Sequence, residues 1–201
     1  MSRTFPRFHV AAAVSMLALF GLAGIAGAQP YEQDRHGFMM GANLGGGTAA
    51  VSASGAGASV SSDREGGVAG NFRFGWGVTP HLSLGVESNA WSKTESGTTV
   101  SFAVSTLAAT YYPSPAAGFY LRAGVGGSSQ KLRVDEGGGF FGEASQTGFG
   151  FTGGLGYEMR LGRKWSLGPA LDYGYSTVDV SGGSLSANYV NFSAAFNWYF
   201  Q

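Results

Sequence analysis

The sequence predicts an all-β fold, an eight-stranded antiparallel up-and-down transmembrane β-barrel preceded by a cleavable signal peptide. Three observations predict it: apolar residues that alternate with small or polar ones along eight segments, connections that alternate between short and long, and an aromatic end to the last segment. Successive strand residues point to opposite faces, so this alternation gives ribbons with one apolar and one polar side. A closed ring of such ribbons crosses a bilayer without exposed edges.

Residues 1–28 have the composition of an export signal. Arg3 and Arg7 precede an apolar run that ends in Ala26-Gly27-Ala28. A positive start, a hydrophobic middle and a small-x-small end are typical of a secretory signal peptide. An uncleaved membrane anchor is the alternative, because the run approaches the roughly 20 residues that span a bilayer. We expect cleavage, which leaves one barrel domain over residues 29–201.

Eight segments follow the alternation, and each equals or slightly exceeds the roughly 9 to 11 residues that cross a bilayer as a tilted strand. The expected strands cover residues 37–48, 68–78, 81–91, 98–112, 118–129, 147–161, 165–180 and 188–201. In the fourth strand we assign Val100, Phe102 and Val104 to the outer face. Pro169 lies inside the seventh strand and cannot donate a ladder hydrogen bond, so we expect a bulge beside Gly168.

The connections sort by length. Tight turns are expected at residues 79–80, 113–117 and 162–164, and longer loops at 49–67, 92–97, 130–146 and 181–186. Short turns at one rim and longer loops at the other are typical of exported outer-membrane barrels. An even strand number returns both termini to the short-turn rim. The segment 48–67 is rich in Gly, Ser and Ala, so we expect it to be mobile.

The polar faces carry charged residues of both signs that we expect inside the barrel. They are Arg73, Glu87, Arg122, Glu158, Arg160 and Asp172. Eight strands give an interior just wide enough for side chains to fill, and an unpaired buried charge is costly. The balanced set therefore predicts a salt-bridge network that plugs the barrel. A selectivity ring in a pore, the alternative, would favour one sign of charge.

Aromatic residues gather near the expected short-turn ends of the strands. The set is Trp76, Tyr112, Phe119, Trp165, Phe196, Trp198 and Phe200. Tryptophan, tyrosine and phenylalanine at strand ends are typical of the girdle that transmembrane barrels place at the membrane–water interface. We expect this girdle at the short-turn rim.

These features resemble the small eight-stranded outer-membrane β-barrel family of Gram-negative bacteria, the OmpA/OmpX-like barrels, along essentially all of residues 29–201. The residues that carry the resemblance are Phe192, Phe196, Trp198, Tyr199 and Phe200. The resemblance implies location in the outer membrane, contact with its lipid and lipopolysaccharide, and delivery by periplasmic chaperones and the barrel-insertion machinery. Family members usually end on an aromatic residue, whereas Gln201 follows here. They include adhesins, tethers, narrow channels and lipid-modifying enzymes, so the fold leaves the function open.

Charge and residue usage exclude several functions. Without cysteine the chain has no disulfide framework and no thiolate metal site. After signal removal ten Lys and Arg stand against twelve Asp and Glu, which offers no basic face for nucleic acid. His36 and His81 both fall at the short-turn rim, which disfavours a Ser–His–acid site at the outer rim. We therefore expect no catalytic residues, no metal site and no cofactor.

The expected function is a non-enzymatic structural or surface-interaction role, with a surface ligand met through loops 49–67 and 130–146. A narrow channel or porin for small solutes is the alternative. A soluble exported lipocalin-like ligand-binding barrel is a third reading, and it requires reversed faces, with Phe and Leu inward and the arginines outward. A lipid enzyme of the outer leaflet is the weakest reading, for want of a suitably placed histidine.

Overall fold

The computed structural model describes residues 35–55, 58–137 and 140–200, all within one compact unit. The expected signal peptide, residues 1–28, and the terminal Gln201 lie outside the described residues. Strands make up most of the described chain: β1 Gly37–Gly55, β2 Ala58–Ser61, β3 Glu65–Thr79, β4 Leu82–Glu95, β5 Thr98–Tyr111, β6 Phe119–Gly137, β7 Phe140–Tyr157, β8 Met159–Arg160, β9 Trp165–Val180 and β10 Gly183–Phe200. In this described part no helix is long and apolar enough to cross a membrane.

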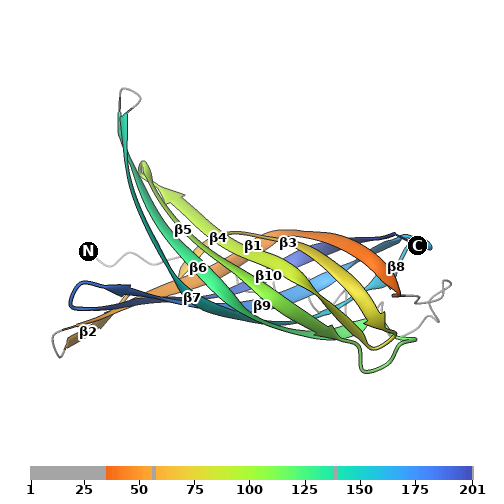
Figure 1. The fold of residues 1–201 in the computed structure, drawn as a ribbon. Helices are drawn as coiled ribbons and strands as arrows, with labels where there is room; N and C mark the ends of the chain where they lie inside the picture. The colour runs from red at the N-terminus through yellow and green to blue at the C-terminus, as the bar shows by residue number, and fades with distance from the viewer. Residues whose placement is uncertain (1–34, 56–57, 138–139, 201) are drawn as a thin grey trace. The chain divides into compact units, whose positions relative to one another are not determined.

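The strands form one closed antiparallel barrel (Figure 1). The sheet follows the order β1-β3-β4-β5-β6-β7-β9-β10, and β10 also pairs with β1, which closes the ring. β2 and β3 together form one barrel strand, because both pair with β1. β7 and β8 form another, because both pair with β9. Ten segments therefore make eight strands, and the predicted eight-stranded antiparallel barrel is confirmed.

Large apolar side chains cover the outside of the barrel. In β10 the even-numbered Phe196 and Phe200 are exposed, whereas the odd-numbered Asn191, Asn197 and Tyr199 are buried. The same alternation exposes leucine, valine and phenylalanine along the other strands. A lipocalin-like barrel would need the opposite orientation, so the placement of the side chains contradicts that alternative.

The face predicted for the fourth strand is wrong. Phe102 of β5 is buried inside the barrel, and Leu107 is exposed on the outside. Thr106 lies directly opposite Glu87 of β4, and directly opposed residues of an antiparallel pair share one face. Because β5 carries apolar residues on both sides, hydrophobicity alone does not orient it. Tyr112, expected in the outer girdle, follows the same parity and is buried inside.

The expected long loops are mostly strand. β1 continues to Gly55, paired with β10 throughout, and β6 and β7 stay paired beyond Gln130. The small residues of segment 48–67 lack a clear alternation, yet β10 supplies backbone partners for residues 48–55, and β1 supplies them for residues 58–61 and 65–67. Most of the described part of this segment is therefore strand rather than loop. At one end of the barrel the paired strands thus continue as hairpins. The other end is the short-turn rim.

The described hairpin tips are very short. Ser96 and Gly97 connect β4 to β5 with φ angles of 51° and 81°. Positive φ at both central residues is typical of a type I′ turn, which matches the twist of the flanking strands. The β9–β10 hairpin turns at Ser181 and Gly182, where Gly182 has a φ of 88°. The expected loops at 92–97 and 181–186 are therefore two-residue turns at the ends of extended strands.

Pro169 lies in β9 without the expected bulge in its own strand. It pairs with Ala194 of β10, and the irregularity lies on the opposite side, where the ladder to β7 and β8 is interrupted around Glu158. The Glu158 N–H donates instead to the Gly118 carbonyl at 2.8 Å. Because proline has no N–H, β9 lacks one donor here, and the break in the neighbouring strand accommodates this.

Candidate functional site in the barrel interior

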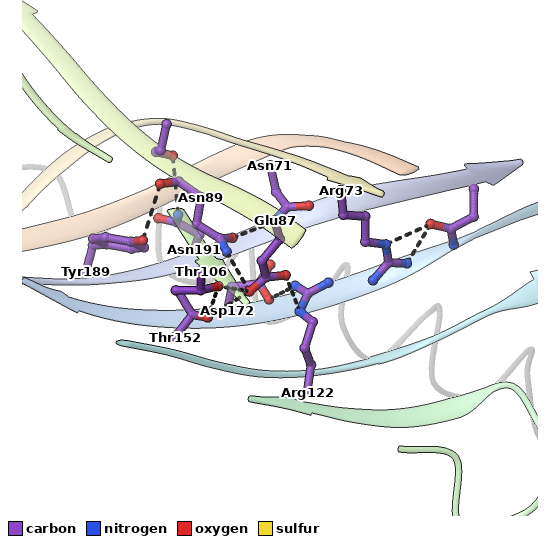
Figure 2. A network of polar contacts seen from close by, with 12 residues as sticks. Asn71, Arg73, Glu87, Asn89, Thr106, Arg122, Thr152, Asp172, Tyr189 and Asn191 are labelled. Carbon is purple, nitrogen blue, oxygen red and sulfur yellow. Dashed lines mark hydrogen bonds and ion pairs between the residues drawn. The ribbon is translucent and has the colours of Figure 1, made fainter. Parts of the chain in front are cut away.

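All six charged residues expected in the lumen are buried, with exposed fractions of at most 5%. They belong to two clusters. The central cluster consists of Glu87, Arg122 and Asp172 with their polar neighbours (Figure 2). The rim cluster surrounds Glu158 near the short-turn end and includes Arg35, Arg73, Tyr112, Arg160, Asn197 and Tyr199.

In the central cluster one guanidinium group joins two carboxylates. Arg122 Nε lies 2.9 Å from Glu87 Oε2, and Arg122 Nη2 donates to Asp172 Oδ1. Glu87 Oε1 also accepts hydrogen bonds from Thr152 Oγ1 at 2.7 Å and Asn89 Nδ2 at 3.1 Å (Figure 2). The contacts of Arg122 with Glu87 and Asp172, and of Thr152 with Glu87, cross the interior between strands that are not neighbours in the sheet. They therefore fill the middle of the barrel and tie opposite walls together.

In the rim cluster Glu158 is the common acceptor. Its Oε2 accepts from the Tyr199 hydroxyl at 2.6 Å, and its Oε1 accepts from the Tyr112 hydroxyl at 3.1 Å and from Asn197 Nδ2 at 3.2 Å. Arg73 Nη2 lies 3.4 Å from the same Oε1. The break between β7 and β8 carries this residue, so the irregular backbone and the acceptor for four side chains coincide.

Arg35 is the buried charge that sequence reasoning missed. Its guanidinium lies over the Tyr112 ring, 3.8 Å from the centroid, and donates to the carbonyls of Pro115 and Ala117 at 2.8 and 2.7 Å. Its Nε is 3.7 Å from Glu158 Oε2. Arg35 precedes β1 and belongs to no alternating segment, so periodicity could not assign it to a face. The sequence offered one signal for its burial: Arg35 lies at the short-turn rim, where Glu158 also lies.

Arg160 closes the rim cluster on the other side. Its guanidinium lies 3.6 Å from the centroid of the Tyr199 ring, and its Nη1 donates to the Arg163 carbonyl at 3.1 Å. Stacking on an aromatic ring stabilises a cation whose charge is shielded from water. Arginine–tyrosine stacks, Arg35 on Tyr112 and Arg160 on Tyr199, thus fill the short-turn end of the interior.

Toward the hairpins the interior contains an apolar cluster. The buried cluster there consists of Ala49, Trp91, Phe102, Val104, Ala187 and Tyr189. The rings of Trp91 and Phe102 stack with centroids 5.5 Å apart, and Trp91 Nε1 donates to the Gly47 carbonyl at 3.2 Å. The prediction of a polar lumen did not include this cluster, because the inverted face of β5 moved Phe102 to the outside.

Glycines on the inner face make room for these side chains. A Cβ added at Gly174 would lie 2.1 Å from the Tyr189 ring, and one at Gly41 would lie 2.4 Å from Asn197 Oδ1. Both approaches are far shorter than van der Waals contact. The high glycine content therefore has a packing reason at these positions, because large inward residues need small neighbours.

Apart from Tyr112, which is buried inside, the predicted girdle residues lie on the outer face near the short-turn rim. Ring contacts connect Trp165 to Trp198 at 3.7 Å and to Phe196 at 4.9 Å, and Trp198 to Phe200 at 5.9 Å. Phe38 extends the row, 5.3 Å from Phe200 and directly opposite Trp76 in the ladder. An aromatic row thus crosses β9, β10, β1 and β3, and it consists of Trp165, Phe196, Trp198, Phe200, Phe38 and Trp76.

The described residues contain no group of three His, Cys, Asp or Glu side chains that could hold a metal ion. His81 lies in the turn after β3, where its Nδ1 is 2.8 Å from the Tyr112 carbonyl oxygen. That contact gives the ring a role in joining two turns at the short-turn rim.

The chain matches the model of a protein family described as the outer membrane protein beta-barrel domain over residues 16–200. The comparison with curated proteins gives no match. Among solved structures, Neisserial surface protein A (NspA) is 19% identical with a TM-score of 0.49, over 81% of this chain and 97% of that one. Ail of Yersinia pestis, in complex with the heparin analogue sucrose octasulfate, is 11% identical with a TM-score of 0.48, over 79% and 99%. OprG of Pseudomonas aeruginosa is 13% identical with a TM-score of 0.47, over 85% and 100%.

Proposed function

This chain belongs to the outer membrane protein β-barrel family, and on that premise we propose that it is a structural or surface-interaction protein of the outer membrane with a plugged interior. The filled interior is the observation that carries the proposal. The rim cluster, the central cluster and the apolar cluster occupy the barrel at successive levels from the short-turn end to the hairpin end. An eight-stranded ring leaves little space beyond such side chains.

The lumen charges Arg73, Glu87, Arg122, Glu158, Arg160 and Asp172 act in this proposal as the plug. The ion pairs Arg73–Glu158, Arg122–Glu87 and Arg122–Asp172 cross the interior rather than running along one strand. A buried charge that loses its partner is strongly destabilising. Opening a path for solutes would separate these ion pairs. The cost of separating them therefore keeps the interior closed to solutes.

Conductance separates the plugged barrel from a narrow channel. We expect purified protein refolded into planar bilayers to give no reproducible unitary current steps in 1 M KCl. Arg122→Ala, which removes the bridge between Glu87 and Asp172, is the comparison variant. If these ion pairs block current, this variant should leak where the unaltered protein does not. Steady single-channel currents from the unaltered protein would overturn the proposed plug and favour the channel alternative.

The hairpins are the surfaces that a partner would meet, with the short turns facing the periplasm. The outward residues of β6 change from Val125 to Lys131 along the strand, and Lys131 pairs with Glu143 across the hairpin at 3.5 Å. Lys93 lies 2.8 Å from Glu65 at the neighbouring hairpin. Charged residues at this level indicate that the strands have left the hydrocarbon region and reach lipopolysaccharide or an external ligand.

Two deletions test the surface role. Removing residues 50–66 keeps the Gly47–Gly67 pair with a two-residue connection, and replacing residues 131–145 by Asn-Gly closes the Gln130–Gln146 pair. We expect at least one deletion to reduce binding of whole cells to host-cell or matrix surfaces, while heat-modifiable migration on gels shows that the barrel still folds. If both folded variants bind like the full protein, the surface-interaction role is wrong.

Residues 1–28 serve in this proposal as the export signal, and Phe196, Trp198 and Phe200 as the segment that the barrel-insertion machinery meets, after delivery by periplasmic chaperones. The aromatic row on the outer face supports the second role, since Trp76, Trp165 and these residues form one patch at the short-turn rim. N-terminal sequencing of outer-membrane protein tests the first role. A mature chain that still begins at residue 1 would contradict it.

A further inference from the structure

The apolar outer surface of the barrel has different heights on opposite sides. On β9 and β10 the outward side chains are mostly large and apolar over eleven residues, from Trp165 to Tyr175 and from Phe200 back to Val190. On β4 and β5 they are so over only five residues, from Leu82 to Val86 and from Tyr111 back to Leu107. At about 3.3 Å per residue and a strand tilt of roughly 40°, these stretches are about 25 and 10 Å high.

Beyond the short stretch, the outward residues of β4 and β5 are small or polar as far as the turn between these strands. They are Ser88, Ala90, Ser92 and Thr94 on β4, and Ser105, Ala103, Ser101 and Thr99 on β5. Ser105 Oγ donates to Ser88 Oγ at 3.1 Å, and the hydroxyl oxygens of Ser92 and Ser101 lie 2.8 Å apart. The polar surface of these two strands is therefore continuous with the hairpin.

The strand register gives the level of each residue in the wall. Directly opposed partners lead from Phe38 round the ring to Thr48, ten residues farther along β1, so a row of partners rises by about 1.25 residues per strand. The row through Ala109 reaches Tyr173 three strands later. Tyr173 therefore lies almost four residues higher than Ala109, which is the level of Ser105. At one height the barrel thus presents a tyrosine on β9 and a serine on β5.

At the short-turn end the apolar surface is present on both sides of the ring. Tyr111 of β5 and Leu167 of β9 are both exposed there, and the same register places them at one level. Tilting the whole barrel to level its hairpin end would move one of these two side chains out of the hydrocarbon. The difference in height is therefore a local property of the hairpin end.

We infer that the barrel thins the outer leaflet of the membrane beside β4 and β5, so that polar lipid headgroups descend to the level of Ser88 and Ser105. A bilayer adjusts to an apolar surface shorter than its own hydrocarbon thickness by thinning locally, at modest cost. The hairpin end faces the outer leaflet, since short turns face the periplasm. The inference rests on the membrane location of the barrel and holds whether or not the interior conducts or the hairpins bind a ligand.

Headgroups and water fit this surface better than a second copy of the chain does. The serine hydroxyls bind each other within one wall, so they need no donor or acceptor from a partner protein. Between this surface and the turn at Ser96, no large apolar side chain of these two described strands points outward. Lipid headgroups can therefore reach Ser88 and Ser105 without exposing apolar surface above them.

Spin labels measure the two depths directly. The chain has no cysteine, so Ser105→Cys and Tyr173→Cys each carry a single nitroxide in the full protein refolded into dimyristoylphosphatidylcholine vesicles. The ratio of collisions with oxygen to collisions with a water-soluble nickel chelate should be several-fold lower for Ser105→Cys, although the two positions are level. Equal ratios would overturn the inference. A Ser105→Cys label shielded from both reagents would also overturn it, because a second protein copy would then cover the surface.

Tyr111→Cys and Leu167→Cys are the matched control pair at the short-turn end. These two labels should give equal collision ratios. Unequal ratios would mean that the whole barrel is tilted, and they would refute local thinning.

Filling the short stretch should remove its preference for a thin bilayer. The unfolding equilibrium constant of the unaltered protein should be larger in dipalmitoleoylphosphatidylcholine vesicles than in the thinner dilauroylphosphatidylcholine vesicles. The double variant Ser88→Leu/Ser105→Leu should bring this ratio of constants closer to one. Ser92→Leu/Ser101→Leu, which replaces the hydrogen-bonded serine pair nearer the turn, is the control and should leave the ratio unchanged. The same response in both double variants would contradict a polar boundary at Ser88 and Ser105.

Discussion

At the scale of single residues, Glu158 contacts five other buried side chains and is the main acceptor at the short-turn end of the interior. It accepts from two tyrosines and an asparagine and faces the guanidinium groups of Arg35 and Arg73. Its own backbone leaves the ladder to make this possible. One carboxylate therefore joins β3, the residue after β5, the β7–β8 break and β10.

Glu158→Gln should lower the free energy of unfolding by about 3–5 kcal/mol, because it leaves buried arginines without their partner. Urea titration of tryptophan fluorescence in detergent micelles measures this. Glu143→Gln is the control, since Glu143 pairs with Lys131 in an exposed position where an ion pair contributes about 0–1 kcal/mol. Equal losses in the two variants would contradict the central position of Glu158.

Gly174→Ala should cost about 1–3 kcal/mol, because the new Cβ would collide with the Tyr189 ring and force the inner packing to shift. Gly153→Ala, where a Cβ meets nothing within 4 Å, is the matched control and should be nearly neutral. The same urea titration compares them. A neutral Gly174→Ala would mean that the interior is looser than the contacts indicate.

At the scale of strands, alternation predicts seven of the eight faces and fails for one. In β10 or β9 one side is apolar and the other polar or small, so the pattern determines the face. In β5 both sides are apolar, and only the ladder to β4, which places Thr106 beside Glu87, orients it. Alternation also does not predict the extension of β1, since its Gly, Ser and Ala residues are held by backbone pairing with β10 rather than by side-chain burial.

The turn at Ser96 and Gly97 gives a prediction for the β4–β5 hairpin. Ser96→Asn should raise stability slightly, because Asn tolerates the positive φ of 51° better than Ser. Gly97→Ala should lower it by roughly 1–2 kcal/mol, because Gly97 has a φ of 81°. Gly66→Ala, with open space and no positive φ recorded, is the control. The changes in stability of Ser96→Asn and Gly97→Ala should have opposite signs. Changes of the same sign would contradict the type I′ geometry.

At the scale of the whole molecule, the outer surface predicts a depth-dependent response to charge. Leu107 and Val60 are each 72% exposed, but Leu107 lies within the apolar wall and Val60 in the β1–β2 hairpin. Leu107→Arg should cost about 2–4 kcal/mol when the protein is refolded into lipid vesicles, and Val60→Arg about 0–1 kcal/mol. Titration with guanidinium chloride in vesicles measures both. Similar costs would mean that the bilayer does not contact the wall where the structure predicts.

The sequence accounts for the barrel, its strand number and the burial of the lumen charges, because each depends on a period of two that can be read locally. It does not reveal Arg35, since this residue precedes the first strand and reaches the interior only through the folded turn at Pro115 and Ala117. It does not reveal the apolar inner cluster either, because Trp91 and Phe102 meet through the register of two strands.

A ladder that runs the full height of the barrel joins β1 to β10, from Phe38 opposite Phe200 to Gly55 opposite Gly183. The first and the last strand to be synthesised are therefore obligate partners. A polypeptide that lacks its final strand leaves β1 and β9 as unpaired edge strands. It cannot close into a barrel, however well its other hairpins form. Assembly must wait for the carboxyl end, so truncation late in the gene is as damaging as truncation early.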